Sequence, residues 1–369
     1  MKILVTGSNG FIGRNLIAEL ANKGLNDVLC YDIDTDINLL DRYCKECEFV
    51  FHLAGINRPQ NQEEFMQGNF DFTSSLLTNL KKHGNKAPVL ITSSTQAALD
   101  NPYGKSKKAG EDLMFSYGKE NEVKVFVYRL HNVFGKWCRP NYNSAVATFC
   151  HQIANDLPVT INDPNVDMNL VYIDDVIAEF IDCLNNRQST NDKIMYISRV
   201  FSVKLGRIAE MLYDFKETRN SLQVPDMSDN FTKALYSTYL SYLPKEQFSY
   251  PLKMNIDHRG SFTEVLKSAD RGQISVNISK PHIIKGNHWH HTKNEKFLVV
   301  SGKGVIRFRQ INGDEIIEYY VSGDKLEVVD IPVGYTHNIE NLGETDMVTL
   351  MWVNEIYDAQ KPDTFFETV

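Results

Sequence analysis

The chain has 369 residues, of which 42% are hydrophobic and 23% charged, and its formal net charge at pH 7 is -8. This length allows two domains with sizeable cores, and the composition is that of a globular protein. The acidic balance and the lack of a long basic run argue against a nucleic acid partner. No apolar stretch could span a membrane, and Gly7 ends the first apolar run too early for a signal peptide, so we expect a cytoplasmic protein.

All six cysteines lie before residue 184, and the only close pair is Cys44 and Cys47. A zinc knuckle needs a second ligand pair at suitable spacing, and none follows. We therefore expect reduced, partly buried thiols. Histidines instead crowd into residues 282–291, in the part of the chain without cysteine.

The first predicted element is a buried strand over residues 3–5, followed by glycines at three-residue spacing and then a helical pattern. In this context the glycines indicate a dinucleotide phosphate site. Gly7 allows a tight turn, Gly10 lets the backbone approach a pyrophosphate, and Gly13 lets the helix pack closely. The free N–H groups at the helix start then face the phosphates. We assign this part of cofactor binding to Gly7, Asn9, Gly10, Phe11, Ile12 and Gly13.

Four further strands follow, with helical segments between them. We expect the strands over residues 27–32, 49–55, 88–94 and 123–130, and a crossover helix over residues 69–82. This alternation predicts an α/β fold with a doubly wound parallel sheet of the Rossmann type. Asp32 ends the second strand, where an acid can bind ribose hydroxyls, and Ala54 lies at the end of the third. No arginine closely follows Asp32, so this strand end favours NAD over NADP.

Ser94 ends the fourth strand, and Tyr103 and Lys107 follow at a spacing that puts both on one helix face. This order of motifs resembles the short-chain dehydrogenase/reductase superfamily. The resemblance implies that Lys107 lowers the tyrosine pKa and that Tyr103 exchanges a proton with the substrate oxygen. The Ser94 hydroxyl would hold the same oxygen, with Thr95 as the alternative. Tyr103 and Lys107 would also contact the cofactor.

Further segments resemble the extended branch of this superfamily, which acts on nucleotide sugars. They are H-L-A-G at 52–55, Asn69, R-L-H-N-V-F-G at 129–135 and V-Y-I-D-D-V at 171–176. The resemblance covers about half the chain and implies a nucleotide-sugar substrate. We assign substrate contacts to Asn57, Arg58, His131 and Asn132.

Two features depart from the pattern of the extended branch. The loop from Ser94 to Tyr103 is short, which should open the site, and Met168-Asn169 replaces a basic residue often found there. Residues 137–242 mix polar loops with helices, expected over residues 143–154 and 208–215. In the extended branch such insertions build a small lobe on the substrate side.

The sequence changes character near residue 245, where short alternating segments broken by glycines begin. We expect strands over residues 273–278, 295–300, 304–309 and 327–331, which predict an all-β barrel or sandwich. The predicted domains are therefore residues 1–244, a reductase domain that binds NAD(P), and residues 245–369.

The second domain resembles the cupin family. Its first motif runs from His288-Trp-His290 through Glu295 to a glycine at 302, and its second ends at His337. Three or four nitrogen and oxygen ligands from two hairpins can hold one divalent metal with an open position. We expect zinc on His288, His290, Glu295 and His337. His291 should face solvent, because neighbouring strand residues point to opposite sides.

Residues 257–264 resemble the D-x-R-G-x-F-x-E opening of the keto-sugar epimerases among the cupins. In those enzymes a histidine shortly after a glycine abstracts the proton next to a sugar ketone. His288 stands at that place after Gly286, so it is a candidate for both the general base and a metal ligand.

The whole chain resembles the bifunctional capsule-sugar enzymes of the CapF type. That resemblance implies C3 epimerisation of a UDP-2-acetamido-2,6-dideoxy-4-ketohexose by the cupin domain and reduction of C4 by the reductase domain. The product would be UDP-2-acetamido-2,6-dideoxy-L-talose, on the route to UDP-N-acetyl-L-fucosamine for capsular polysaccharide. It also implies NADPH, which Asp32 does not predict, with NADH as the alternative.

Other functions remain open at this point. One is a nucleotide-sugar 4-epimerase or dehydratase with a structural cupin, although Ser94-Thr-Gln96 stands where a dehydratase often has acids. Another is a non-enzymatic redox sensor, which would not need to keep Tyr103 and Lys107. We also expect a homodimer, since cupin barrels commonly pair through sheet edges.

Overall fold

The computed structural model describes residues 1–59, 61, 63–185 and 194–369. The chain forms two compact units, Met1–Tyr213 with Lys233–Pro244, and Asp214–Thr232 with Lys245–Val369. The predicted domains were residues 1–244 and 245–369, whereas the compact C-terminal unit also includes residues 214–232. The backbone N–H of Val224 donates to Lys267 (2.8 Å), and that of Lys267 donates to Leu222 (2.7 Å). These bonds tie the segment to the C-terminal unit.

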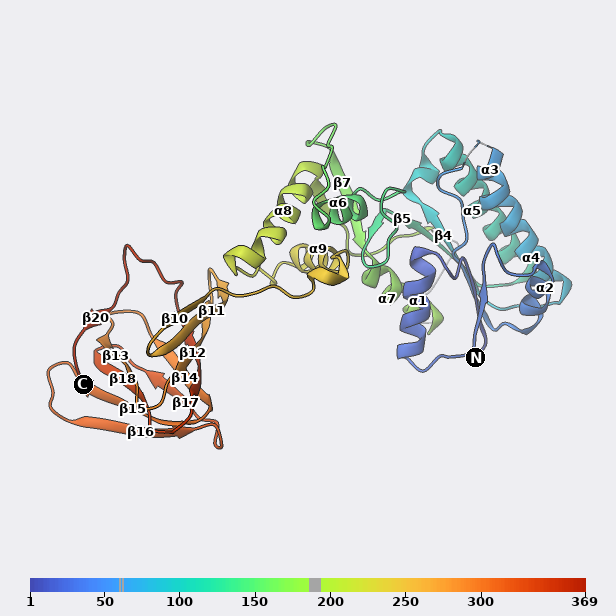
Figure 1. Cartoon of the computed structure of the whole chain (residues 1–369). Helices are drawn as coiled ribbons and strands as arrows, with labels where there is room; N and C mark the ends of the chain where they lie inside the picture. The colour runs from blue at the N-terminus through green and yellow to red at the C-terminus, as the bar shows by residue number, and fades with distance from the viewer. Residues whose placement is uncertain (60, 62, 186–193) are drawn as a thin grey trace. The chain divides into compact units, whose positions relative to one another are not determined.

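The N-terminal unit is built on a six-stranded sheet in the order β2-β1-β3-β4-β5-β8 (Figure 1). All its neighbouring strands are parallel. The strands are β1 (Ile3–Thr6), β2 (Val28–Tyr31), β3 (Phe49–His52), β4 (Val89–Ser94), β5 (Val125–Leu130) and β8 (Ile194–Met195). The predicted parallel α/β fold is therefore confirmed.

Helices bury both faces of this sheet, which explains why its strands are apolar at successive positions. Ile3 and Val5 pack with the cluster that includes helices α1 and α7, whereas Leu4 packs with α2, α4 and α5. Alternate side chains of a strand point to opposite faces, so each strand supplies both cores. The helices are α1 (Phe11–Asn22), α2 (Ile37–Glu46), α3 (Glu63–Met66), α4 (Phe72–Lys82), α5 (Pro102–Asn121) and α7 (Ile173–Leu184), with a π-helix over Gln67–Asp71 and a 3₁₀ turn over Thr95–Ala98.

The strand order reverses between β1 and β3, whose carboxyl ends therefore flank a crevice. In open parallel sheets, ligands bind at this point. The glycine loop follows β1, and Ala54 follows β3, so both candidate cofactor segments lie at this crevice.

The N-terminal unit also contains a three-stranded sheet, β6-β7-β9, and further helices. Two of these helices, α8 and α9, extend into residues 214–232 of the C-terminal unit. The expected helices over residues 143–154 and 208–215 correspond to α6 and to part of α8. The bounds are β6 (Asn132–Phe134), β7 (Asp167–Tyr172), β9 (Phe201–Lys204), α6 (Ala145–Ala154), α8 (Leu205–Ser221) and α9 (Asn230–Leu240).

The C-terminal unit contains two antiparallel sheets, β10-β11-β12-β19-β14-β17 and β16-β15-β18-β13-β20 (Figure 1). Its core includes Phe297, Ile306, Phe308 and Ile339 from facing strands. The strands are β10 (Met254–Asp257), β11 (Gly260–Ser268), β12 (Gly272–Ser279), β13 (Ile284–Trp289), β14 (Glu295–Ser301), β15 (Lys303–Gln310), β16 (Ile316–Ser322), β17 (Val328–Ile331), β18 (Tyr335–Asn341), β19 (Met347–Val353) and β20 (Phe365–Phe366). The expected all-β second domain is confirmed.

A bulge in β13 sets the direction in which the His288 side chain points. The pairing with β18 shifts between Gly286 and His288, and Asn287 has a φ of 59°. A Cβ on Gly286 would lie 2.8 Å from the carbonyl oxygen of His337, so only glycine fits beside that strand. Past the bulge, His288 pairs directly with His337.

In the part of the chain that the structure describes, no helix is both long and apolar enough to cross a bilayer. All six cysteines are free thiols, and four of them are buried, as expected.

A buried ion pair joins helix α5 to the sheet edge at which the candidate catalytic residues lie. Glu111 is fully buried and accepts bonds from Arg129 Nε (2.8 Å) and Nη2 (2.7 Å). It also accepts a bond from the Ser93 hydroxyl at 2.6 Å. This carboxylate therefore links α5, β4 and β5 in one network.

We expect Glu111→Ala to lower the local free energy of unfolding of α5, β4 and β5 by about 3–5 kcal/mol, because Arg129 would be left buried without its counter-ion. Hydrogen exchange of these segments at increasing urea concentration measures the effect. The exposed Glu120 on the same helix supplies the control variant, Glu120→Ala. Equal protection of α5 in both variants would contradict the role given to this pair.

Candidate active sites

The glycine loop has the close packing that the sequence predicted. Gly7 has a φ of 69°, and a Cβ there would lie 2.7 Å from the Ala54 nitrogen. A Cβ on Gly13 would lie 2.2 Å from the carbonyl oxygen of Gly7. Gly10 is the N-cap of α1 and has no side chain to bond the free N–H groups at the helix start. The helix N-terminus beginning at Phe11 and Ile12 is thus suited to phosphate.

Asp32 lies beside this loop. Its carboxylate accepts bonds from the backbone N–H groups of Asn9 (2.7 Å) and Ile33 (2.8 Å). Two arginines near in sequence have other partners. Arg14 donates to the carbonyl oxygen of Trp137 at 2.7 Å, and Arg42 Nε lies 3.0 Å from Glu46. Neither is bonded to Asp32.

Tyr103 and Lys107 lie on α5, with the lysine Nζ 6.0 Å from the centre of the tyrosine ring. The Tyr103 hydroxyl donates to Asn57 Oδ1 at 2.9 Å. Burial raises the Tyr103 pKa to about 12, although the Ser94 hydroxyl acts in the opposite direction. Burial lowers the Lys107 pKa to about 8, opposed by the charge of Glu111. At pH 7 the tyrosine therefore holds a proton that it can donate, and the lysine is mostly protonated.

Of the two hydroxyls considered at the end of β4, Ser94 is the one that acts on Tyr103. The Ser94 hydroxyl also accepts a bond from the backbone N–H of Gln96 at 3.2 Å. Thr95 begins the 3₁₀ turn that follows the strand. This arrangement favours Ser94.

Of the four expected substrate residues, Asn57 contacts Tyr103, and the assignment of the other three stays a prediction. No hydrogen bond within the described residues joins Arg58, His131 or Asn132 to the tyrosine. Arg58 is exposed, and burial lowers the pKa of the half-buried His131. Asn132 Nδ2 donates to the carbonyl oxygen of Asn169 at 3.4 Å.

Asn69 has a supporting role that sequence reasoning did not assign. Its side-chain oxygen accepts a hydrogen bond from the backbone N–H of Ile56, and its NH₂ group donates one to the Ile56 carbonyl oxygen, each at 3.0 Å. It also donates to the Ser106 hydroxyl, which in turn donates to the carbonyl oxygen of Tyr103. The motif match had marked the position, but only the fold shows that Asn69 connects the Asn57 loop to the tyrosine helix.

In the C-terminal unit, the four expected metal ligands converge. One ligand atom from each of His288, His290, Glu295 and His337 lies within 4.8 Å of all the others. Glu295 Oε2 is 3.5 Å from His290 Nε2 and 3.2 Å from His337 Nε2. His291, by contrast, is exposed, as expected.

This donor set fits a divalent metal. His290 Nε2, Glu295 Oε2 and both ring nitrogens of His337 are buried without a hydrogen-bond partner. Burial lowers the His288 pKa to about 4. Burial opposes ionisation of Glu295, but the neighbouring imidazoles of His290 and His337 lower its pKa overall. Imidazole and carboxylate groups that lack protons are the ligands zinc binds.

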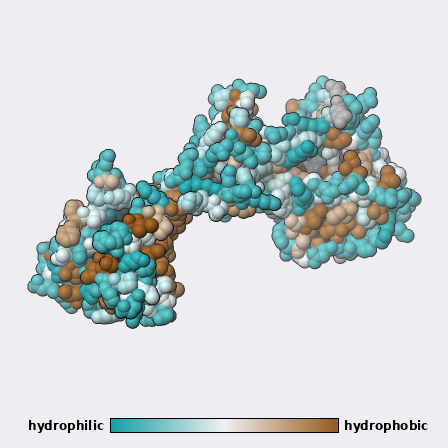
Figure 2. Space-filling view, in the orientation of Figure 1, coloured by the Kyte–Doolittle hydropathy of each residue, from teal (hydrophilic) through white to brown (hydrophobic). Residues whose placement is uncertain are grey.

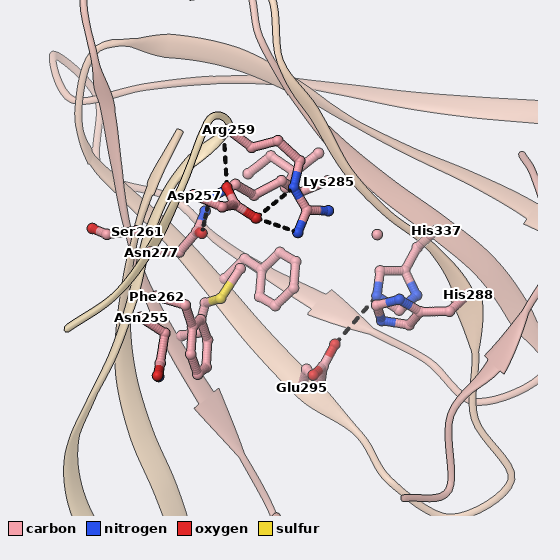
Figure 3. Close-up of a pocket in the computed structure, with 14 residues that line it drawn as sticks. Asn255, Asp257, Arg259, Ser261, Phe262, Asn277, Lys285, His288, Glu295 and His337 are labelled. Carbon is pink, nitrogen blue, oxygen red and sulfur yellow. Dashed lines mark hydrogen bonds and ion pairs between the residues drawn. The ribbon is translucent and has the colours of Figure 1, made fainter. Parts of the chain in front are cut away.

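A cavity of about 310 Å³ opens beside this cluster. Figure 3 shows Glu295, His288 and His337 at one end of it and Asp257, Arg259 and Lys285 at the other. Arg259 forms two bonds to Asp257, at 2.9 and 2.6 Å. Lys285 donates to Asn277 Oδ1 at 2.7 Å and to the carbonyl oxygen of Ile278 at 2.8 Å.

Lys285 was not singled out from the sequence. It lies three residues before His288 on the bulged strand, and burial lowers its pKa. Lys285 and Arg259 therefore give one end of the cavity positive charge, and the histidine–carboxylate cluster lies at the other end. Such a cavity suits an anionic or oxygen-rich ligand.

Comparison with known proteins agrees with this two-part architecture. Residues 3–197 match the NAD dependent epimerase/dehydratase family, and residues 255–365 match the polysaccharide biosynthesis C-terminal domain. The chain is 44% identical over 365 residues to a UDP-2-acetamido-2,6-beta-L-arabino-hexul-4-ose reductase from Pseudomonas aeruginosa, covering 99% of this chain and 98% of that protein.

Solved structures give the same result. The capsular polysaccharide assembling protein CapF from Staphylococcus aureus has 54% sequence identity and a TM-score of 0.94, with complete coverage of both chains. A UDP-glucuronic acid 4-epimerase from Bacillus cereus shares the fold over 68% of this chain and 100% of its own, at 20% identity and a TM-score of 0.57. The chain therefore belongs to the CapF family, in which an extended short-chain dehydrogenase/reductase domain precedes a polysaccharide biosynthesis C-terminal domain.

Proposed function

We propose that the chain is a bifunctional enzyme that acts on a UDP-2-acetamido-2,6-dideoxy-4-ketohexose. Its family makes it an NAD(P)-dependent nucleotide-sugar epimerase/reductase. The C-terminal unit would epimerise C3, and the N-terminal unit would then reduce C4 with NADPH. The product would be UDP-2-acetamido-2,6-dideoxy-L-talose, on the route to UDP-N-acetyl-L-fucosamine for capsular polysaccharide. The observation that carries the proposal is the presence of two chemically different sites in one chain, a Tyr103–Lys107 proton donor and a histidine–carboxylate cavity.

The two reactions have a fixed order. The proton on C3 is acidic only while C4 is a ketone, because the electron pair left on C3 is then delocalised onto the C4 oxygen as an enolate. Reduction of C4 removes this delocalisation. Epimerisation must therefore precede reduction, and a proton from solvent enters C3 during it.

In the reductase site, the bound nicotinamide would supply a hydride to C4. The glycine loop, Asp32 and Ala54 would hold the cofactor. Tyr103 would donate its proton to the C4 oxygen, so that the ketone gains one hydride and one proton and becomes an alcohol. Lys107 would stabilise the resulting tyrosinate, and Ser94 would orient the oxygen. Asn57, already bonded to Tyr103, would exchange that contact for the sugar.

In the epimerase site, His290, Glu295 and His337 would hold zinc, which supplies a Lewis acid when bound. His288 serves either as a fourth ligand or as the base that removes the C3 proton. Lys285 and Arg259, at the other end of the cavity, provide positive charge for an anionic substrate or for the enolate oxygen.

Association into homodimers is also part of the proposal. Strand β16 lies at the edge of its sheet. The exposed fractions of its residues Ile316, Tyr319 and Tyr320 are 52%, 51% and 68%. Figure 2 shows apolar areas among the polar surface of the C-terminal unit. An exposed edge strand with apolar side chains can pair with a second copy, which would remove it from solvent.

Tyr103→Phe should lower the rate of NADPH oxidation with the ketosugar by about 10²–10⁴-fold, because the ring stays and only the proton donor is lost. Absorbance of the reduced nicotinamide measures the rate. Deuterium exchange at C3, which needs no reduction, should continue in the variant and serves as the control for folding. An undiminished rate of oxidation would end the short-chain reductase assignment.

Cofactor choice should depend on Asp32. Its carboxylate repels a 2′-phosphate, so Asp32→Ala should raise kcat/KM for NADPH relative to NADH by about tenfold, the effect of about 1.4 kcal/mol. The exposed Asp34, two residues later, gives the control variant Asp34→Ala. If Asp32→Ala leaves the ratio between the two cofactors unchanged, the carboxylate does not face the ribose. Arg14 and Arg42 are the candidates for binding the 2′-phosphate if the wild type prefers NADPH, and each would then leave its present partner.

His290→Ala should spare reduction and abolish epimerisation. The variant should still oxidise NADPH with the ketosugar, but its product should keep the original C3 configuration and carry no deuterium at C3 in heavy water. Mass spectrometry and NMR of the product measure both, and His291→Ala, an exposed neighbour, is the control. Normal delivery of the inverted, deuterated sugar by His290→Ala would show that the cupin unit is not the epimerase.

A further inference from the structure

The C-terminal tail of the chain contacts a proposed metal ligand from behind. His290 Nδ1 lies 2.6 Å from the carbonyl oxygen of Asp363. A carbonyl oxygen can only accept, so the imidazole must donate, and its proton must be on Nδ1. In the neutral imidazole Nε2 then carries the lone pair, and this atom is buried, unpartnered and 3.5 Å from Glu295 Oε2. The tail thus selects the tautomer that a metal ligand needs.

The side chain of Asp363 fixes the loop that follows His290. One carboxylate oxygen accepts the backbone N–H of His291 at 3.0 Å. The other accepts the backbone N–H groups of Thr292 and Lys293, both at 2.9 Å, and the Thr292 hydroxyl at 3.1 Å. Charge-assisted bonds to a carboxylate are among the stronger hydrogen bonds in proteins. One residue therefore holds both the imidazole and its loop.

The loop holds the tail in return. Lys293 is only 7% exposed, and its Nζ donates to the carbonyl oxygen of Pro362 (2.9 Å) and to the Thr364 hydroxyl (2.8 Å). Immediately afterwards, β20 pairs with β13, opposite Trp289 and His288. The position of the Asp363 carbonyl is thus fixed on both sides.

We propose that Asp363 is a positioning residue for the metal centre, holding His290 in the Nδ1–H tautomer and in the orientation that points Nε2 at Glu295. This inference rests on the metal centre in the proposed function. Groups that orient a metal ligand from behind typically contribute 10–100-fold to metal affinity. The carboxylate holds the loop 291–293 to the tail and so keeps the Asp363 carbonyl oxygen against His290 Nδ1. Loss of the carboxylate should release that carbonyl and weaken zinc binding by about 10–100-fold, although no ligand is removed.

The backbone conformation at Asp363 determines which substitutions remove the carboxylate without adding backbone strain. Its φ is 32°, a conformation that glycine adopts without strain and asparagine tolerates. Asp363→Gly therefore removes the carboxylate without opposing the backbone, and Asp363→Asn keeps one acceptor oxygen without the charge. Asp358→Gly is the matched control, since Asp358 is exposed in the same tail and its carboxylate accepts the N–H of the nearby Gln360.

The affinity test uses the full chain, stripped of metal, with zinc alone as the probe in competition with a chromophoric chelator. We expect the zinc dissociation constant to rise about 10–100-fold in Asp363→Gly, less in Asp363→Asn, and not in Asp358→Gly. Circular dichroism and thermal unfolding of all four metal-free proteins check that the C-terminal unit of each is folded.

A second readout reports on the tautomer directly. Nitrogen NMR of histidine-labelled, zinc-free protein should show the His290 proton on Nδ1 in the wild type and a mixture of tautomers in Asp363→Gly. A wild-type His290 with its proton on Nε2 would overturn the inference even if a variant failed to fold. Equal zinc affinity and an unchanged tautomer in Asp363→Gly would also overturn it. Absence of zinc binding by the wild type would instead overturn the proposed metal centre itself.

Discussion

A buried carboxylate faced by imidazoles is the interaction on which the C-terminal unit depends. Glu295 and His337 meet at 3.2 Å in the interior, and several of the surrounding ring nitrogens have no partner. Leaving such groups buried and unsatisfied costs about 1–3 kcal/mol each, so their convergence needs a compensating ligand. The bulge at Asn287, the hairpin strands and the tail all serve to aim these side chains at one point.

The N-terminal unit uses a different strategy. Its reactive groups, Tyr103 and Lys107, are held by a scaffold that includes a satisfied buried ion pair, Glu111 with Arg129. Burial keeps the tyrosine protonated and brings the lysine pKa to about 8, so a proton donor is ready at neutral pH. One chain thus places a proton donor on a helix that packs on a parallel sheet, and a cluster of electron-pair donors between strands of an antiparallel unit.

Contiguous motifs were predictable from the sequence, because each is shaped by its own local backbone. The glycine loop, the Tyr103–Lys107 helix and the His288–His290 strand belong to this class, as does the parallel sheet with its alternating pattern. Contacts between distant segments were not. Asp363 meets His290 across 73 residues and Asn57 meets Tyr103 across 46, and no periodicity encodes such pairings. Residues 214–232 joined the C-terminal unit through backbone bonds, which composition cannot reveal.

The central claim is that the C-terminal unit makes C3 exchange its proton before any reduction occurs. Wild-type protein should therefore be incubated with the UDP-4-ketosugar in heavy water without a nicotinamide cofactor, and the recovered sugar examined by mass spectrometry and NMR. The account predicts one deuterium at C3, acquired while C4 is still a ketone. Recovery of unlabelled ketosugar, with deuterium entering C3 only when NADPH is added, would contradict it.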